Sequence, residues 1–225
     1  MPDRISRLPL IGGHRALDLV NTVAPRIPVE AQDEYLATPE DLLVWAGRTG
    51  LVDASEAGAV GAAWAASPAA AARALVAVRA TRDALSAVLS AHLARGAAAA
   101  ATRDELEHLS LAWAAAASRS RLAPTTDGRV AARWAIDSSP ALLIADRISQ
   151  DAVDLLCDVD LDRLGMCPVE EGGCGWLFLD HSRNRSRRWC TMEACGTGSK
   201  ARRLTERRRV ARGAAARPGQ VAGPA

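Results

Sequence analysis

The pattern of hydrophobic and polar positions along residues 14–157 is that of a series of amphipathic helices. The longest predicted helix opens at Pro68 and ends at Gly96, because apolar side chains recur along it three and four residues apart. The same spacing follows Pro140 and continues towards Cys157, which we expect to lie in the core on an apolar helix face. The pattern therefore predicts a body made mainly of α-helices.

Shorter elements are predicted around these two helices. A first helix is expected over residues 14–23. One further helix start has Thr38 as N-cap, Pro39 at the first helical position and acids in the first turn. Two others, Asp53 to Glu56 and Thr102 to Glu105, combine a capping side chain with an acid three residues later that can bond back to it. Asp127 and Gly128 stand between two weakly alternating segments, which predicts a short β-hairpin.

Composition agrees with a helical protein. Hydrophobic residues make up 49% of the chain, but aromatic residues are only 4% and much of the rest is alanine. Alanine favours helices and buries little surface, so closely packed helices are expected rather than a large sheet. Residues 1–20 show no signal peptide, and no apolar run approaches the length of a membrane span. We therefore expect a cytoplasmic protein that does not enter a membrane.

Four of the five cysteines fall close together, as two pairs separated by a loop: Cys167, Cys174, Cys190 and Cys195. Four thiolates in two short-range pairs are the ligand set of a structural zinc site, which leaves no position for a catalytic water. One alternative is a pair of disulfides, which a protein without an export signal disfavours. The other is four unrelated buried thiols, which would not cluster in a chain so poor in cysteine. We therefore expect one structural Zn²⁺.

The order of elements around these cysteines predicts a small module. Residues 176–179 make an apolar strand, 180–184 turn the chain, 186–189 return it as the second half of a hairpin, and 198–212 form a helix. Loop, hairpin and metal-anchored helix resemble a treble-clef finger, which needs its metal because its own apolar surface is small. The predicted organisation is a helical domain over 1–160, a zinc finger over 161–212 and a disordered tail over 213–225.

Charge is divided unevenly along the chain. Residues 181–212 carry ten arginines and one lysine against two glutamates, a net charge of +9, whereas residues 1–180 carry −8. Arginine offers a fork of donors that matches phosphate geometry, so the basic arm indicates a nucleic-acid partner. The alternative is that the charges solvate a surface or pair with the acidic body. The residues expected to contact DNA, or RNA by the same chemistry, are Arg183, Arg185, Arg187, Arg188, Lys200, Arg202, Arg203, Arg207 and Arg208.

Three stretches resemble known families. CGWLFLDHSRNRSRRWC from Cys174 to Cys190, followed by TMEACG and a basic segment, resembles the CGNR zinc finger. HRALDLVNTV from residue 14 and YLATPEDLLVWAGRTGLVD from residue 35 resemble the helical ABATE domain that precedes that finger. The resemblance covers most of the chain. It implies a bacterial, stress-responsive transcription regulator that binds DNA through its zinc module.

One position departs from the family motif. The family has Cys-Gly-Asn-Arg at the last metal ligand, whereas here Thr197 and Gly198 follow Cys195 and Gly196. Thr197 or Ser199 would be able to cap the following helix, since Ser and Thr are favoured N-cap residues. The charge of the missing arginine would then come from Lys200 or Arg202.

The first predicted helix holds a polar group of unusual density, formed by His14, Asp18 and Asn21. It is interpreted either as a pocket for a small-molecule effector or as a structural group, in which Asp18 orients His14 and Asn21 bonds to backbone. Buried polar residues usually satisfy one another, which favours the structural interpretation. No nucleophile–base pair, glycine-rich phosphate loop or open metal site indicates an enzyme.

These observations predict a DNA-binding regulator whose helical body acts as a sensor or as a homodimerisation domain. Two alternatives stay open. One is a protein-interaction module whose finger docks on an acidic partner, and the other is a small-molecule-binding body with a purely structural finger.

Overall fold

The computed structural model describes residues 3–24, 33–94, 102–124, 132–136 and 138–198. The longer helices are α3 (Pro39–Arg48), α4 (Ala54–Ala66), α5 (Pro68–Ala94), α6 (Arg103–Ala117) and α7 (Leu143–Asp158), and the short ones are α1 (Asp3–Arg7) and α2 (Arg15–Val20). The strands are β1 (Val23–Ala24), β2 (Asp33–Glu34), β3 (Ser120–Pro124), β4 (Ala132–Ile136), β5 (Leu164–Met166) and β6 (Leu177–Leu179). The prediction of a mainly α fold is confirmed.

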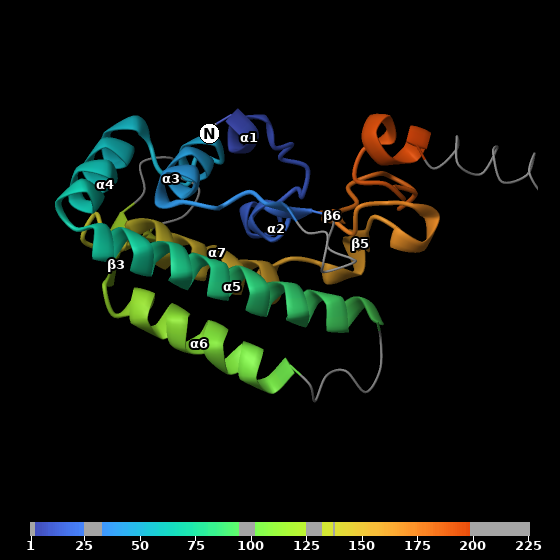
Figure 1. The fold of residues 1–225 in the computed structure, drawn as a ribbon. Helices are drawn as coiled ribbons and strands as arrows, with labels where there is room; N and C mark the ends of the chain where they lie inside the picture. Colours follow the sequence, from blue (N-terminus) through green and yellow to red (C-terminus); the bar gives the residue numbers. More distant parts are fainter. Residues whose placement is uncertain (1–2, 25–32, 95–101, 125–131, 137, 199–225) are drawn as a thin grey trace, which may run out of the picture.

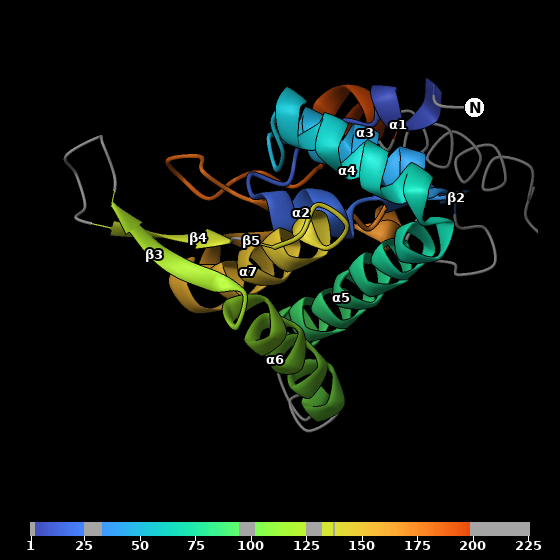
Figure 2. The same ribbon diagram turned by 90° about the vertical axis from the view of Figure 1, so that its left-hand side faces the viewer.

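The helices are arranged around α5 and α7, which lie side by side (Figure 1). α6 packs against both, while α1, α3 and α4 lie on the opposite side (Figure 1). α2 contacts α5 and α7 near the end of the molecule where β5 and β6 lie (Figure 1). The β3–β4 hairpin extends away from the helices (Figure 2). The cysteine-containing segment is thus held at one end of the helical body.

Two of the predicted helix starts form as capping boxes. Thr38 accepts a hydrogen bond from Asp41 N, and the Asp41 side chain accepts one from Thr38 N. Asp53 and Glu56 make the same reciprocal pair at the start of α4. The predicted helix start at Thr102 is confirmed, since Thr102 is the N-cap of α6, but its predicted capping bond is wrong: the side chain makes no such bond, and its ψ of 16° is far from the extended value that such caps need.

The structure corrects three further predictions: the end of the first helix, the start of α7 and the burial of Cys157. The first helix ends at Val20, after which the chain pairs as β1. α7 begins at Leu143, three residues after Pro140, because residues 139–142 form a turn. Cys157 is exposed rather than buried. It lies two residues beyond Leu155, about 200° further round a helix of 3.6 residues per turn, and therefore off the buried face.

The predicted hairpin is confirmed by β3 and β4, which pair antiparallel from Ser120 opposite Ile136 to Pro124 opposite Ala132. The predicted turn at 127–128 lies outside the described residues, as does the tail over 213–225.

In the part of the chain that the structure describes, the core forms two hydrophobic clusters, and β6 lies between them. Trp176 and Phe178 belong to the cluster around α1, α3 and the first turns of α5 and α7. Leu177 and Leu179 belong to the cluster around α2 and the later turns of α5 and α7. Since successive strand residues point to opposite faces, β6 is buried on both. Residues 176–179 are therefore continuously apolar because both faces of the strand are covered by the helical body.

Among the described residues, no single helix has the length and apolar composition of a membrane span. The consecutive pair α4 and α5 meets these criteria jointly, but the two helices are bent by 119° at their junction.

Candidate functional site

The sulfur atoms of the four clustered cysteines lie within 4.8 Å of one another. Cys190 Sγ is 3.4 Å from Cys174 Sγ and 3.5 Å from Cys195 Sγ. Ligands at about 2.3 Å from a tetrahedral zinc ion stand about 3.8 Å from each other, so this spacing fits one ion. Cys167 and Cys190 are buried, and the other two are half-buried. The four cysteines therefore fit one structural zinc ion, as their spacing in the sequence predicts.

The pKa values of Cys167 and Cys190 are shifted by neighbouring thiols. The pKa of Cys167 is lowered to about 2, because Cys174 and Cys190 hydrogen-bond to its sulfur. The pKa of Cys190 is raised to about 12 by its hydrogen bond to Cys167 and by burial. A bound Zn²⁺ supplies the positive charge that stabilises all four ligands as thiolates.

The first pair of cysteines is brought together by a loop that folds back on its own start. Gly173 N donates to Pro168 O at 2.7 Å, and Gly175 N donates to Cys167 O at 3.2 Å. A Cβ on Gly173 would stand 2.6 Å from the Cys167 sulfur. Any larger residue would push the loop away from the metal site. The close approach that glycine permits lets a gap of six residues bring Cys167 and Cys174 to one ion.

The second pair, Cys190 and Cys195, is brought together by a single helical turn, Met192–Gly196. Thr191 caps this turn: its Oγ1 accepts from Ala194 N at 3.1 Å and its carbonyl accepts from Cys195 N at 3.3 Å. Cys190 directly precedes the cap and Cys195 lies within the turn, so both sulfurs reach the same site.

The apolar strand pairs with a different partner from the predicted one. β6 is antiparallel to β5, with Leu164 opposite Leu179. The prediction that 186–189 returns as the second strand is therefore wrong. A strand that is buried on both faces needs a largely apolar partner. Residues 164–166 are Leu-Gly-Met, whereas residues 186–189 include two arginines. Gly165 also permits the close packing, because a Cβ there would stand 2.7 Å from the Phe178 ring.

The helical body closes the other edge of β6. Asn21 Nδ2 donates to Leu177 O at 2.8 Å, and Asn21 Oδ1 accepts from Leu177 N at 2.9 Å. Leu179 N donates to Gly12 O at 2.8 Å. Both side chains of the Asn21–Leu177 pair are buried. The segment that leads into and out of α2 thus acts as a neighbouring strand for β6.

The loop after β6 is organised by the buried carboxylate of Asp180. Its Oδ1 accepts from Ser182 N and its Oδ2 accepts from Arg187 N, both at 2.8 Å. The Ser182 hydroxyl accepts from Ser186 N at 3.0 Å. Hydrogen bonding by the Ser182 side chain is the largest effect that lowers the pKa of Asp180, followed by the bonds from these backbone N–H groups. The arginine-rich loop therefore has a defined shape.

Three of the four loop arginines face outwards. Arg183 is exposed. Arg185, at a positive φ of 48°, places Nη2 3.5 Å from an Asp160 carboxylate oxygen. Arg188 pairs with Glu171 at 2.5 Å while 59% of its side chain stays exposed. Exposed ion pairs contribute only about 0–1 kcal/mol, so a phosphate is able to replace these partners.

Arg187 is turned inwards, contrary to the expectation that it contacts nucleic acid. Its guanidinium carbon lies 4.2 Å from the centre of the Phe178 ring. Its N–H groups donate to four backbone carbonyls, those of Ile11 (3.0 Å), Leu179 (3.2 Å), Trp189 (3.3 Å) and Cys190 (2.7 Å). Arg187 therefore joins the metal loop, the strand and the N-terminal segment. The other predicted contacts, Lys200, Arg202, Arg203, Arg207 and Arg208, lie outside the described residues, as do residues 199–212 of the predicted helix.

Two family models match the chain. The ABATE model, described as "Putative stress-induced transcription regulator", matches residues 13–159, which is more than half of the chain. The chain belongs to the ABATE family. The CGNR zinc finger model matches residues 163–208, which include all four clustered cysteines. A search of curated proteins found no match.

In this CGNR finger, Thr197 stands where the family motif has asparagine. Its hydroxyl donates to Met192 O at 2.9 Å, at the start of the turn that carries Cys195. Its own backbone is helical, with φ −69° and ψ −42°. Thr197 therefore bonds backwards to the metal-binding turn, which is a different role from the helix cap predicted for it.

Within the ABATE domain, the side chains of His14, Asp18 and Asn21 form hydrogen bonds with backbone groups. His14 caps α2 through Nδ1, which accepts from Ala16 N at 3.2 Å. Asp18 Oδ1 accepts from Gly12 N at 2.8 Å. Burial raises the pKa of Asp18, against the hydrogen bonds it accepts, and burial lowers the pKa of His14.

Asn21 bonds to the backbone of β6, and none of the three predicted effector residues lines the cleft beside α2. The cleft beside α2 is lined instead by Arg15, with Asp151 and Asp154 of α7. Sequence reasoning missed these residues, because Arg15 and Asp151 are 136 positions apart. The sequence feature that could have indicated this cleft is the pair of acids three residues apart on α7, Asp151 and Asp154.

Proposed function

We propose that this ABATE protein regulates transcription by binding DNA through its CGNR finger, with the helical domain as the part that senses a signal. It acts in this proposal as a regulator rather than an enzyme. The family description supports a role in transcription, and the finger supplies the surface that suits a polyanion.

The observation that carries the proposal is the loop held by Asp180. It presents Arg183, Arg185 and Arg188 outwards, next to the metal site and at one end of the molecule (Figure 1). A guanidinium matches phosphate geometry with two parallel donors, and a fixed loop loses little conformational freedom on binding. The basic segment 200–212 begins five residues after the last cysteine.

The sensing role is supported by how closely the finger and the helical domain are joined. β6 of the finger contributes to both hydrophobic clusters of the body and is hydrogen-bonded to the segment around α2. A change in the packing of α2 would therefore displace the strand that carries the arginine loop.

Replacing the three exposed arginines tests the DNA interface. We expect the variant with glutamine at 183, 185 and 188 to bind a mixed-sequence DNA duplex about 10- to 100-fold more weakly at about 0.1 M salt. Fluorescence anisotropy of labelled duplex measures this. Circular dichroism and zinc content should stay those of the wild type, because the ion pairs lost are exposed.

A matched control removes the same charge elsewhere. Arg73 on α5, Arg103 on α6 and Arg121 on β3 are exposed, and their replacement by glutamine should leave the affinity within about twofold, since long-range charge effects are screened by salt. Equal losses in both variants would show a non-specific effect of net charge. An unchanged affinity in the finger variant would overturn the proposed interface.

A further inference from the structure

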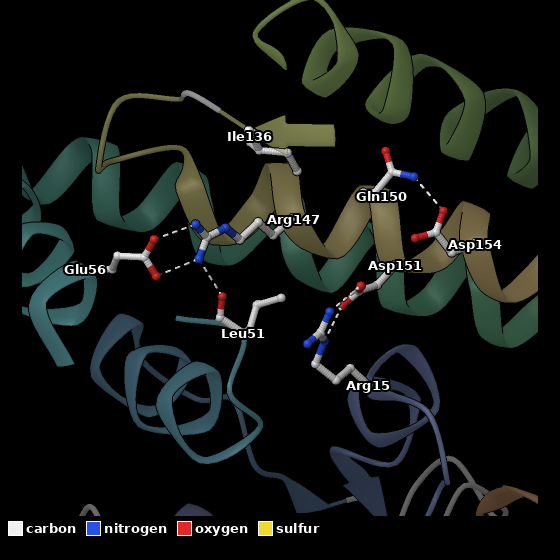
Figure 3. Close-up of a pocket in the computed structure, with 9 residues that line it drawn as sticks. Arg15, Leu51, Glu56, Ile136, Arg147, Gln150, Asp151 and Asp154 are labelled. Carbon is white, nitrogen blue, oxygen red and sulfur yellow. Dashed lines mark hydrogen bonds and ion pairs between the residues drawn. The ribbon is translucent and has the colours of Figure 1, made fainter. Parts of the chain in front are cut away.

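A polar cleft of about 550 Å³ lies between α2, α7, the start of α4 and the end of β4 (Figure 3). This volume is in the range of small-molecule sites, about 300–1,000 Å³. Leu51 and Ile136 contribute apolar side chains to the lining, one on each side of Arg147 in the view of Figure 3. The remaining lining is dominated by charged side chains, which determines the kind of ligand that fits.

Two guanidinium groups in the cleft are fixed by carboxylates. Arg15 bonds side-on to both oxygens of Asp151, each at 2.8 Å. Arg147 bonds end-on to Glu56, at 2.7 and 2.5 Å, and donates to Leu51 O at 2.7 Å (Figure 3). The cleft therefore exists with its charged groups already oriented, which lowers the entropic cost of binding.

Arg15 keeps donors for a ligand. Its bonds to Asp151 use Nε–H and one N–H of Nη2, out of the five that a guanidinium offers. Asp151 is buried, with 9% of its side chain exposed, whereas 44% of the Arg15 side chain is exposed. The free edge of Arg15 thus suits a carboxylate.

A third carboxylate, Asp154, stands three residues beyond Asp151 on the same face of α7, at a neighbouring position about 5–6 Å away. Its Oδ1 accepts from Gln150 Nε2 at 2.5 Å, and Gln150 Oε1 accepts from Trp113 Nε1 at 3.0 Å. Within the part of the chain that the structure describes, Asp154 Oδ2 accepts no hydrogen bond. This oxygen suits an ammonium group.

The charge balance selects between ligand classes. Three carboxylates face two guanidinium groups, and each guanidinium already pairs with one carboxylate, so a free phosphate would meet a net negative lining. A ligand that carries both an ammonium and a carboxylate would satisfy Asp154 and Arg15 together. An apolar substituent would then face Leu51 and Ile136.

We infer that this cleft binds a small zwitterion of the free amino-acid class, with its carboxylate on Arg15 and its ammonium on Asp154. The inference deepens the sensing role and rests on the proposed function only for its effect on DNA. The link is α2 itself: Arg15 is in its first turn, and Asn21, at its C-terminal cap, holds β6 of the finger.

Binding is tested with the zinc-loaded full-length protein and no DNA. A panel of the common L-amino acids is titrated by calorimetry and by thermal shift. For each amino acid that binds, the amine and the carboxylic acid with the same side chain are titrated as separate probes. We expect at least one amino acid to bind, and each single-charge analogue to bind about tenfold more weakly or worse, since each lacks one charge-assisted hydrogen bond. No binding at millimolar concentration, or equal binding of the analogues, would overturn the inference.

Asp154→Asn separates the site from general effects on α7. It should weaken amino-acid binding about tenfold by removing the negative charge from the ammonium position. Asp158→Asn is the matched control, one turn further along α7 and exposed outside the cleft, and should leave the affinity unchanged. Equal affinity in Asp154→Asn and the wild type would contradict the assignment.

DNA affinity is then measured with and without the amino acid that binds. A change in DNA affinity that Asp154→Asn abolishes supports the coupling through α2. Amino-acid binding without any effect on DNA would refute the sensing role and leave the site in place. DNA binding without any amino-acid binding would refute the site and leave the DNA role in place.

Discussion

Replacing Asn21 by alanine removes the side chain that joins the ABATE domain to the strand of the finger. Asn21 is wholly buried, and its amide makes two hydrogen bonds, at 2.8 and 2.9 Å, to the backbone of Leu177. The variant leaves the N–H and the C=O of Leu177 without these partners in a place closed to water. Because both groups belong to β6, the damage falls on the junction between the body and the metal module.

The size of the effect follows from these two groups. Leaving a buried donor or acceptor unpaired costs about 1–3 kcal/mol, so with two such groups the free energy of unfolding should fall by about 2–6 kcal/mol. At about 2–4 °C per kcal/mol for a chain of this length, the Tm should drop by roughly 4–24 °C. This is a large part of the total stability of a typical domain, about 5–15 kcal/mol.

Urea denaturation is monitored by two signals: circular dichroism reports the unfolding of the helical body, and zinc release reports the unfolding of the finger. Both signals should shift together, because the finger strand lies inside the common core. Asn184→Ala in the exposed loop is the matched control and should change the stability by less than about 0.5 kcal/mol. A change in Asn21→Ala as small as in this control, or zinc release at much lower urea than helix unfolding in the wild type, would refute the shared core.

Three further changes separate the other interactions. Arg187→Gln should lower stability by about 2–4 kcal/mol through its lost bonds to carbonyls, with the salt dependence of DNA binding unaltered; a flatter salt dependence would place Arg187 at the interface instead. Metal analysis should find about one zinc per chain, and far less in Cys190→Ser, because an alcohol does not replace a thiolate ligand; retained zinc would contradict the ligand set. Pairing with Arg147 lowers the pKa of Glu56 from 4.5 to about 2, so this pair stabilises the fold above pH 4.5 and loses its effect as the pH falls towards 2. The stability difference between wild type and Glu56→Gln, about 1 kcal/mol at neutral pH, should shrink over that range in urea titrations; a difference independent of pH would contradict the pairing.

Features that depend on neighbours in the chain were predictable from the sequence. The capping boxes at Thr38 and Asp53 form because cap and acid are three residues apart, within the reach of one helical turn. The zinc ligands were predictable for the same reason, since each pair of cysteines is closed by a short loop. The wrong prediction for Cys157 also concerns neighbouring residues. Its spacing of two residues from the buried Leu155 places it on the other face of α7, where it is exposed.

Features that depend on distant parts of the chain were not predictable. The partner of Asn21 is 156 residues away, and the carbonyl of Ile11 that receives Arg187 is 176 residues away. In the sequence, Arg187 is one of four similar arginines in a loop. Only the fold, which brings the N-terminal segment against β6, distinguishes the structural arginine from its three exposed neighbours.

The salt dependence of DNA binding by the zinc-loaded full-length protein tests most directly whether the finger contacts phosphate. If Arg183, Arg185 and Arg188 each neutralise one phosphate, the logarithm of the association constant should fall with the logarithm of salt concentration with a slope of about −2.7 or steeper. Replacing all three by glutamine should make that slope shallower by about 2.7. Absence of binding, or the same slope in the wild type and the variant, would contradict a DNA interface at these arginines.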